Sequence, residues 1–102
     1  MRGPTPSSAD LKILDPEGRF RDRLEADRAS IARLNKTGDL NGLERVVHGL
    51  AGAAGTFGYA EVGEIAIEID EAFRGGRKPT ALEVTRLLAT LQQALSKPTK
   101  SG

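Results

Sequence analysis

Apolar residues recur every three or four positions along four separate segments of the chain, which is the spacing of amphipathic helices. In order, the four stripes are Phe20, Leu24, Ile31 and Leu34; Leu40, Leu43, Val46, Val47, Leu50, Ala53, Ala54 and Phe57; Val62, Ile65, Ala66, Ile69, Ala72 and Phe73; and Val84, Leu87, Leu88, Leu91 and Leu95. No segment shows the alternation of apolar and polar residues that is typical of a half-buried strand. The pattern therefore predicts an all-α domain of four helices.

Residues that favour helix starts and ends lie between these stripes. Asp15-Pro16-Glu17 predicts the start of the first helix, with the aspartate as its cap, and this helix extends to about residue 36. Thr37-Gly38-Asp39 separates it from a helix that we expect from Leu40 to Phe57. Gly58 then occupies the position where a left-handed residue usually ends a helix.

The third and fourth helices are separated by Gly75-Gly76, and the fourth begins with a stronger signal. Thr80 and Glu83 have the spacing of a capping box, in which each side chain accepts a hydrogen bond from the other residue's backbone N–H. Because the connections between consecutive helices are short, neighbouring helices are expected to run antiparallel. The predicted assembly is an antiparallel up-down four-helix bundle.

The length of 102 residues suits one domain with a single hydrophobic core. We expect the bundle to span residues 15–96. Residues 1–14 contain Pro4 and Pro6 and are expected to form a flexible N-terminal lead, and residues 97–102 are expected to form a disordered tail.

Composition excludes several classes of function. Fifteen Lys and Arg against fourteen Asp and Glu leave a formal net charge of +1, which gives no reason to expect nucleic acid or a membrane surface as the partner. The absence of cysteine excludes disulfides, a thiolate nucleophile and a thiolate metal site. No apolar stretch approaches the length of a bilayer span or resembles a signal-peptide core, so we expect a soluble protein that is not exported by a cleaved signal. We further expect it to be cytoplasmic, which the absence of cysteine allows, and monomeric.

The sole histidine, His48, lies in a predicted helix that contains several glycines. On a helical wheel at about 100° per residue, the imidazole projects away from the apolar stripe, so we expect it to be exposed to solvent. Its neighbours on that face are Glu44, Arg45, Ala51, Gly52 and Gly55. Each glycine costs a helix about 1 kcal/mol relative to alanine, so we interpret the small residues as clearance for another protein.

The stretch from His48 to Asp70 resembles the Hpt domain, the histidine-containing phosphotransfer module of multistep phosphorelays. That family has the pattern His-x-Leu-Lys-Gly, a glycine ten residues after the histidine, and a later Leu-Glu pair. The matching residues of this chain are His48, Leu50, Gly52, Gly58 and the pair Ile69-Asp70, with Val62 and Ala66 at an apolar and a small position. The chain departs from the pattern at Ala51, where many members have a lysine close to the phosphoryl group.

The resemblance implies a phosphoryl carrier of two-component signal transduction, without enzymatic turnover of a small molecule. His48 is then the phosphoacceptor nucleophile, which takes a phosphoryl group from a receiver-domain aspartate and passes it to another receiver. The expected partners are response-regulator receiver domains and, as a further candidate, a hybrid histidine kinase. We expect the chain to bind no metal or other cofactor, with Mg²⁺ supplied by the receiver. The predicted partner-binding residues are Glu44, Arg45, Ala51, Gly52 and Gly55.

The sequence also leaves other interpretations open. The missing lysine at Ala51 allows an Hpt-like adaptor that binds or sequesters a receiver domain or a histidine kinase without being phosphorylated. A dimeric phosphoacceptor domain of a histidine kinase is a third alternative, although the chain lacks the two-helix hairpin pattern of such domains and an ATP-binding domain. We interpret Arg74-Gly75-Gly76-Arg77-Lys78 as a solvated turn rather than a phosphate-binding loop, and we expect Tyr59 to pack at a helix junction.

Overall fold

The computed structural model describes residues 14–96, which form four helices and thus confirm the all-α prediction. The helices are α2 (Arg19–Thr37), α3 (Leu40–Ala53), α4 (Ala60–Arg74) and α5 (Ala81–Ser96). Almost all of the predicted N-terminal lead, residues 1–13, and the predicted tail, residues 97–102, lie outside the described residues.

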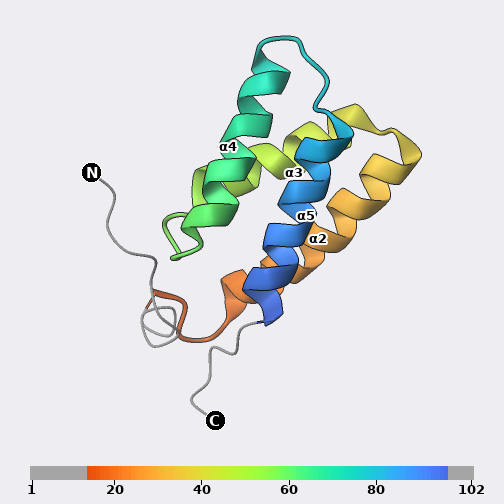
Figure 1. The fold of residues 1–102 in the computed structure, drawn as a ribbon. Helices are drawn as coiled ribbons and strands as arrows, with labels where there is room; N and C mark the ends of the chain where they lie inside the picture. The colour runs from red at the N-terminus through yellow and green to blue at the C-terminus, as the bar shows by residue number, and fades with distance from the viewer. Residues whose placement is uncertain (1–13, 97–102) are drawn as a thin grey trace.

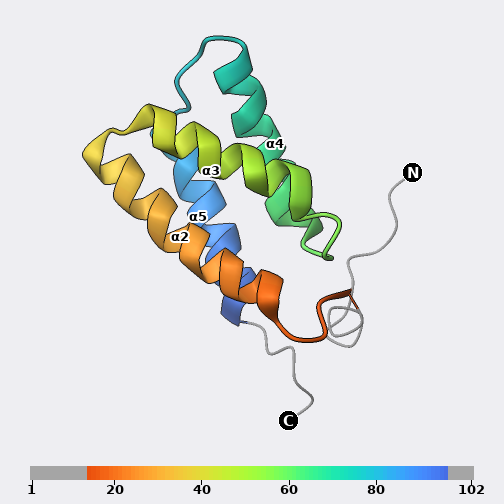
Figure 2. The same ribbon diagram turned by 180° about the vertical axis from the view of Figure 1, so that it is seen from behind.

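The helices pack as a closed ring in which each contacts two others. Contacts join α2 to α3, α3 to α4, α4 to α5, and α5 back to α2. Consecutive helices run in opposite directions, and α2 and α5 lie side by side in both views (Figures 1 and 2). In the same views α3 and α4 diverge from the turn that joins them. The predicted four-helix bundle is confirmed.

The apolar stripes meet in one core that is mainly aliphatic. Its fully buried large side chains are Leu24, Ile31, Leu43, Leu50, Ile69, Leu87, Leu91, Val47, Val62 and Val84. Burying one such side chain contributes about 1.5–3 kcal/mol, several times the helix propensity of any single residue, so packing rather than propensity holds the bundle together. Leu40 departs from the predicted stripe because it is the first residue of α3, where its side chain is 38% exposed.

The first helix starts later than the sequence predicts. α2 begins at Arg19 because Gly18, in a left-handed conformation at φ 70°, separates the helix from the residues before it. Asp15 nevertheless caps the helix from outside, since its carboxylate oxygens accept hydrogen bonds from the N–H groups of Phe20 and Arg21 at 3.2 and 3.0 Å. The capping residue was predicted correctly and the helix boundary was not.

The second helix ends earlier than predicted, at Ala53 rather than Phe57. Tight turns follow, in which the carbonyl oxygen of Ala54 accepts hydrogen bonds from the N–H groups of Phe57 and Tyr59 at 3.2 and 2.9 Å. Freed from the helix, the Phe57 ring stacks on Phe20 of α2 with ring centroids 4.4 Å apart. Tyr59 is buried directly before α4, which confirms its predicted place at the helix junction.

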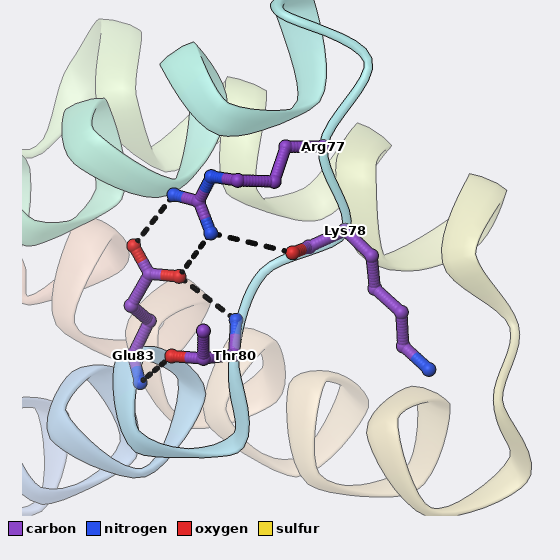
Figure 3. Close-up of polar contacts among 4 residues, drawn as sticks. All are labelled: Arg77, Lys78, Thr80 and Glu83. Atoms are coloured by element: carbon purple, nitrogen blue, oxygen red, sulfur yellow. Dashed lines mark hydrogen bonds and ion pairs between the residues drawn. The ribbon is translucent and has the colours of Figure 1, made fainter.

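Thr80 and Glu83 form the predicted capping box at the start of α5. The Glu83 N–H donates to Thr80 Oγ1 at 3.1 Å, and the Thr80 N–H donates to Glu83 Oε1 at 2.8 Å. Arg77 adds two hydrogen bonds to the same carboxylate, at 2.9 and 3.0 Å (Figure 3). The Arg77 guanidinium first, and the Thr80 N–H second, lower the pKa of Glu83 from 4.5 to about 2.

This capping box predicts a stability difference that depends on pH. Because folding lowers the pKa of Glu83, its ionised carboxylate stabilises the folded state above about pH 4.5, and this contribution is lost as the pH falls toward 2. We therefore expect wild type to be more stable than Glu83→Gln at pH 7, with the difference shrinking between pH 4.5 and 3. Urea unfolding midpoints of both proteins across this range measure it. Glu25→Gln, on an exposed residue of α2, serves as the control. A wild-type advantage that does not change with pH would contradict the assignment.

Candidate functional site

His48 lies in the middle of α3 and projects away from the core. The opposite side of the helix carries the buried residues Leu43, Val47 and Leu50. The imidazole side chain is 63% exposed, which confirms the prediction from the helical wheel. A ring in this position is accessible to another protein.

Asp70 of α4 faces this imidazole. Both of its carboxylate oxygens lie 3.2 Å from His48 Nδ1, and the carboxylate itself is only 10% exposed. An ionised carboxylate can only accept hydrogen bonds, so Nδ1 carries the ring proton and donates a hydrogen bond to Asp70. In the neutral ring, the other nitrogen, Nε2, is then unprotonated and has a free lone pair. Asp70 thus selects the tautomer and the ring orientation in which the free lone pair is on Nε2.

An open hollow adjoins His48 between α3 and α4. It is lined by Asn41, Glu44, Arg45, His48, Asp70 and Arg74. Arg74 Nε lies 3.4 Å from Asp70 Oδ2, which forms an ion pair across one turn of α4. The predicted solvated turn is exposed throughout residues 74–78, and its first residue, Arg74, is also the last residue of α4. The helical spacing of Asp70 and Arg74 brings this arginine to the hollow, which the sequence interpretation did not predict.

The predicted partner-binding residues fall into two groups around His48. Glu44 and Arg45 lie on the N-terminal side of His48 along α3, where they line the hollow. The other three, toward the C-terminal end of α3, are Ala51, Gly52 and Gly55. A Cβ built on Gly52 or on Gly55 would meet no atom within 4 Å, so neither glycine is required by contacts of its own missing side chain. We call these three residues the small face.

The turn after α3 approaches α4 closely. A Cβ on Gly63 of α4 would lie 3.3 Å from the backbone nitrogen of Gly55 and 3.7 Å from Ala54 Cβ. Such a contact is tighter than ordinary van der Waals packing, so Gly63 is small because two backbones meet there. This close approach also sets how α4 lies along α3.

An exposed apolar residue of α4 lies beside the small face. The register that pairs Gly63 with Gly55 and Asp70 with His48 places Ile67 opposite Ala51. The Ile67 side chain is 46% exposed. This residue was not among those predicted from the sequence, where the signal for it is an isoleucine outside the apolar stripe of its helix.

Another glycine of α3, Gly49, has a side chain of α2 as its neighbour. Arg23 of α2 lies against Gly49, where a Cβ would be 2.7 Å from Arg23 Nη2. The same guanidinium lies over the Phe20 ring, and Arg23 Nε lies 3.4 Å from a carboxylate oxygen of Asp27. Burial raises the pKa of Asp27, and the charge of Arg23 opposes that rise. A Cβ at Gly49 would therefore displace the flexible end of Arg23, whereas a Cβ at Gly52 would meet no neighbour.

Within residues 14–96, no group of three or more histidine, aspartate or glutamate side chains is placed to hold a metal ion. The carboxylate nearest His48 is already engaged by the imidazole and by Arg74. In the same part of the chain, no helix combines the length and the apolar character needed to cross a membrane.

Comparison with family models agrees with the resemblance seen in the sequence. The model of the Hpt domain matches residues 18–97, a range that includes all four helices. The chain belongs to the Hpt domain family. Comparisons with curated proteins and with solved structures give no significant match. Hpt domains are phosphoryl carriers that act through histidine in phosphorelays and generally interact with receiver domains.

The contact between His48 and Asp70 predicts the tautomer of the imidazole in this Hpt domain. We expect neutral His48 to carry its proton on Nδ1 in the wild type, and to shift toward the form protonated on Nε2 in Asp70→Ala, because no acceptor then faces Nδ1. The ¹⁵N chemical shifts of the two ring nitrogens report the tautomer directly. Glu71→Ala, which removes the neighbouring exposed carboxylate, is the matched control and leaves the tautomer unchanged. Identical ring shifts in wild type and Asp70→Ala would contradict the orientation assigned to His48.

Proposed function

We propose that this Hpt domain is an intermediate of a phosphorelay, in which His48 accepts a phosphoryl group from a receiver-domain aspartate and passes it to a second receiver. The observation that carries this proposal is the geometry of the imidazole. Its Nδ1 faces a buried carboxylate, while the ring as a whole is mostly exposed. Nε2 is therefore an oriented nucleophile that a partner protein can reach.

The transfer needs no general acid or base from this chain. The Nε2 lone pair forms a bond to phosphorus, and the bond between phosphorus and the receiver's carboxylate oxygen breaks, with its electron pair leaving on the carboxylate. The ring then carries a positive charge, and its Nδ1 proton remains 3.2 Å from the Asp70 oxygens, which stabilise that charge. In the onward step the second receiver's aspartate attacks phosphorus and the N–P bond breaks.

Phosphoryl transfer depends mainly on in-line positioning and on neutralising charge, commonly with Mg²⁺. The residues around His48 do not fit a metal site, since Asp70 is engaged and Glu44 is the one other carboxylate lining the hollow. We therefore expect the metal to come from the receiver domain. The cytoplasmic location expected from the sequence fits such a partner and is part of the proposal.

The small face and Ile67 support a direction of approach for the receiver. Gly52 and Gly55 leave open space beside α3, and Ile67 adds an exposed apolar side chain across from Ala51. A receiver that covers this side reaches Nε2 without displacing a large side chain. Glu44 and Arg45 then lie at the polar edge of the contact.

A phosphorylation-independent adaptor is the second candidate. Ala51, a half-buried small residue, leaves the C-terminal side of His48 without the lysine found in many Hpt domains. An adaptor would use the same face to bind or sequester a receiver domain or a hybrid histidine kinase.

The relay proposal is tested by His48→Gln. This substitution is expected to abolish phosphoryl acceptance from a ³²P-labelled receiver, and to change the free energy of unfolding by no more than about 0.5 kcal/mol because the side chain is largely exposed. In the wild type we expect a label that is labile in acid and stable in alkali, as a phosphoramidate is. Tight binding of the receiver without any label on wild type would support the adaptor instead.

The docking face is tested by Gly52→Leu. Because a Cβ at Gly52 has no neighbour, Gly52→Ala is expected to be neutral or stabilising by up to about 1 kcal/mol, and Gly52→Leu is also expected to fold. The leucine is nevertheless expected to slow single-turnover transfer, because it keeps the receiver's phosphorus from the near-attack distance of about 3–3.5 Å.

Two controls separate docking from folding. Ala29→Leu places the same side chain on the exposed face of α2 and is expected to leave the transfer rate unchanged. Gly63→Leu is expected to destabilise the fold by about 1–3 kcal/mol, because its Cβ is forced against the Gly55 backbone. Wild-type transfer by a folded Gly52→Leu protein would remove the argument for a docking surface on the small face.

A further inference from the structure

Phosphorylation of His48 would attach to Nε2 a phosphoryl group whose oxygens carry about two negative charges at pH 7. Two carboxylates lie close to that position, because Asp70 faces the ring and Glu44 lines the adjoining hollow. The small face contributes no cation. A stable phosphorylated state therefore requires positive charge from elsewhere on the surface of the domain.

Arg74 is placed to supply this charge. It shares one carboxylate with the histidine, since Asp70 Oδ2 lies 3.2 Å from His48 Nδ1 and 3.4 Å from Arg74 Nε. Side chains of a helix lean toward its N-terminus, which on α4 directs Arg74 toward Asp70 and so toward His48. The contact recorded for this ion pair is made by Nε, and the side chain is 68% exposed, so another anion can reach the guanidinium.

Arg45 provides a second cation in the same hollow. It lies one helical turn before His48 on α3, and within residues 14–96 its side chain forms no hydrogen bond or ion pair. The imidazole of His48 leans toward that same turn of α3. The guanidinium group is the side chain best suited to bind phosphate oxygens, because its donors form a fork that matches their geometry.

We propose that Arg74, positioned by Asp70, binds the phosphoryl group carried on His48 Nε2, and that Arg45 contributes a second, weaker contact from the other wall of the hollow. This inference rests on the proposed function and identifies what neutralises the phosphoryl charge in a chain with alanine at residue 51. The cations lie on the N-terminal side of His48, and the small face on the opposite side stays free of charged side chains. Phosphoryl binding and receiver docking are thereby centred on different sides of His48, with Arg45 at the edge between them.

The position of a phosphotransfer equilibrium tests this inference independently of docking. The receiver is chosen so that its aspartyl phosphate is long-lived, and both proteins are kept at concentrations below the dissociation constant of their complex. Under these conditions, the equilibrium ratio of phosphorylated Hpt domain to phosphorylated receiver reflects the unbound proteins and not their complex. Loss of one exposed charge contact is expected to lower this ratio about three- to fivefold in Arg74→Gln. Arg74→Lys is expected to stay within about twofold of the wild type, because it keeps the charge.

Arg86→Gln is the matched control, since it removes the same charge from an exposed residue of α5, a helix that does not contact α3. A second readout separates phosphoryl binding from a merely structural role of Arg74. In the phosphorylated protein, the ³¹P signal titrates with pH as the phosphoryl group gains a proton, and a bound cation favours the unprotonated form. The midpoint of this titration is expected to rise in Arg74→Gln and to be restored in Arg74→Lys.

The outcomes distinguish this inference from the function on which it rests. If wild type takes no label on His48, the proposed function fails and this inference fails with it. If wild type is labelled but Arg74→Gln retains the wild-type equilibrium ratio and ³¹P midpoint, the relay stands and the phosphoryl-binding role of Arg74 is overturned. A loss of equal size in Arg86→Gln would also overturn it, since net charge alone would then explain the effect.

Discussion

The contact between His48 Nδ1 and the carboxylate of Asp70 is the interaction on which the rest of the site depends. It joins two helices, and it exists only because α4 lies along α3 in one particular register. The close approach at Gly63 helps to set that register. A shift of one residue along α4 would turn the carboxylate by about 100° away from the imidazole. Packing at the turn between α3 and α4 thus controls which ring nitrogen of His48 is left unprotonated.

The same packing divides the surface around His48 into two chemically different sides. Toward the N-terminus of α3 the two helices diverge (Figure 2). Arg45 and Arg74 line the hollow that adjoins His48. Toward the C-terminus the helices converge, and there the open space beside Gly52 and Gly55 adjoins the exposed apolar side chain of Ile67. A carrier that must both stabilise a phosphoryl group and admit a partner's reacting residue has reason to keep these two sides apart, because a cation that binds the phosphoryl group then does not obstruct docking.

Glycines of similar appearance in the sequence have different causes in the structure. Gly49 accommodates Arg23 from α2, and Gly63 allows two backbones to meet. Gly52 has neither neighbour, yet it costs α3 helix propensity. Of these three glycines, Gly52 alone has no neighbour within the folded chain that accounts for it. Contact with another protein is therefore the explanation we propose for the small face. The distinction rests on neighbours contributed by other helices, which no local pattern contains.

The sequence by itself determined the features that depend on near neighbours in the chain. Helical periodicity gave the four-helix bundle and the exposure of His48, and short-range capping gave the box at Thr80 and Glu83. Tertiary structure decided the helix boundaries at Ala53 and Arg19, where turns and cross-helix packing override the apolar pattern. It also decided the positions of Asp70, which faces a histidine more than twenty residues away, and of Arg74, which pairs with Asp70. Sequence periodicity states which side of a helix is polar, but the partner across a helix interface is set only when the whole core packs.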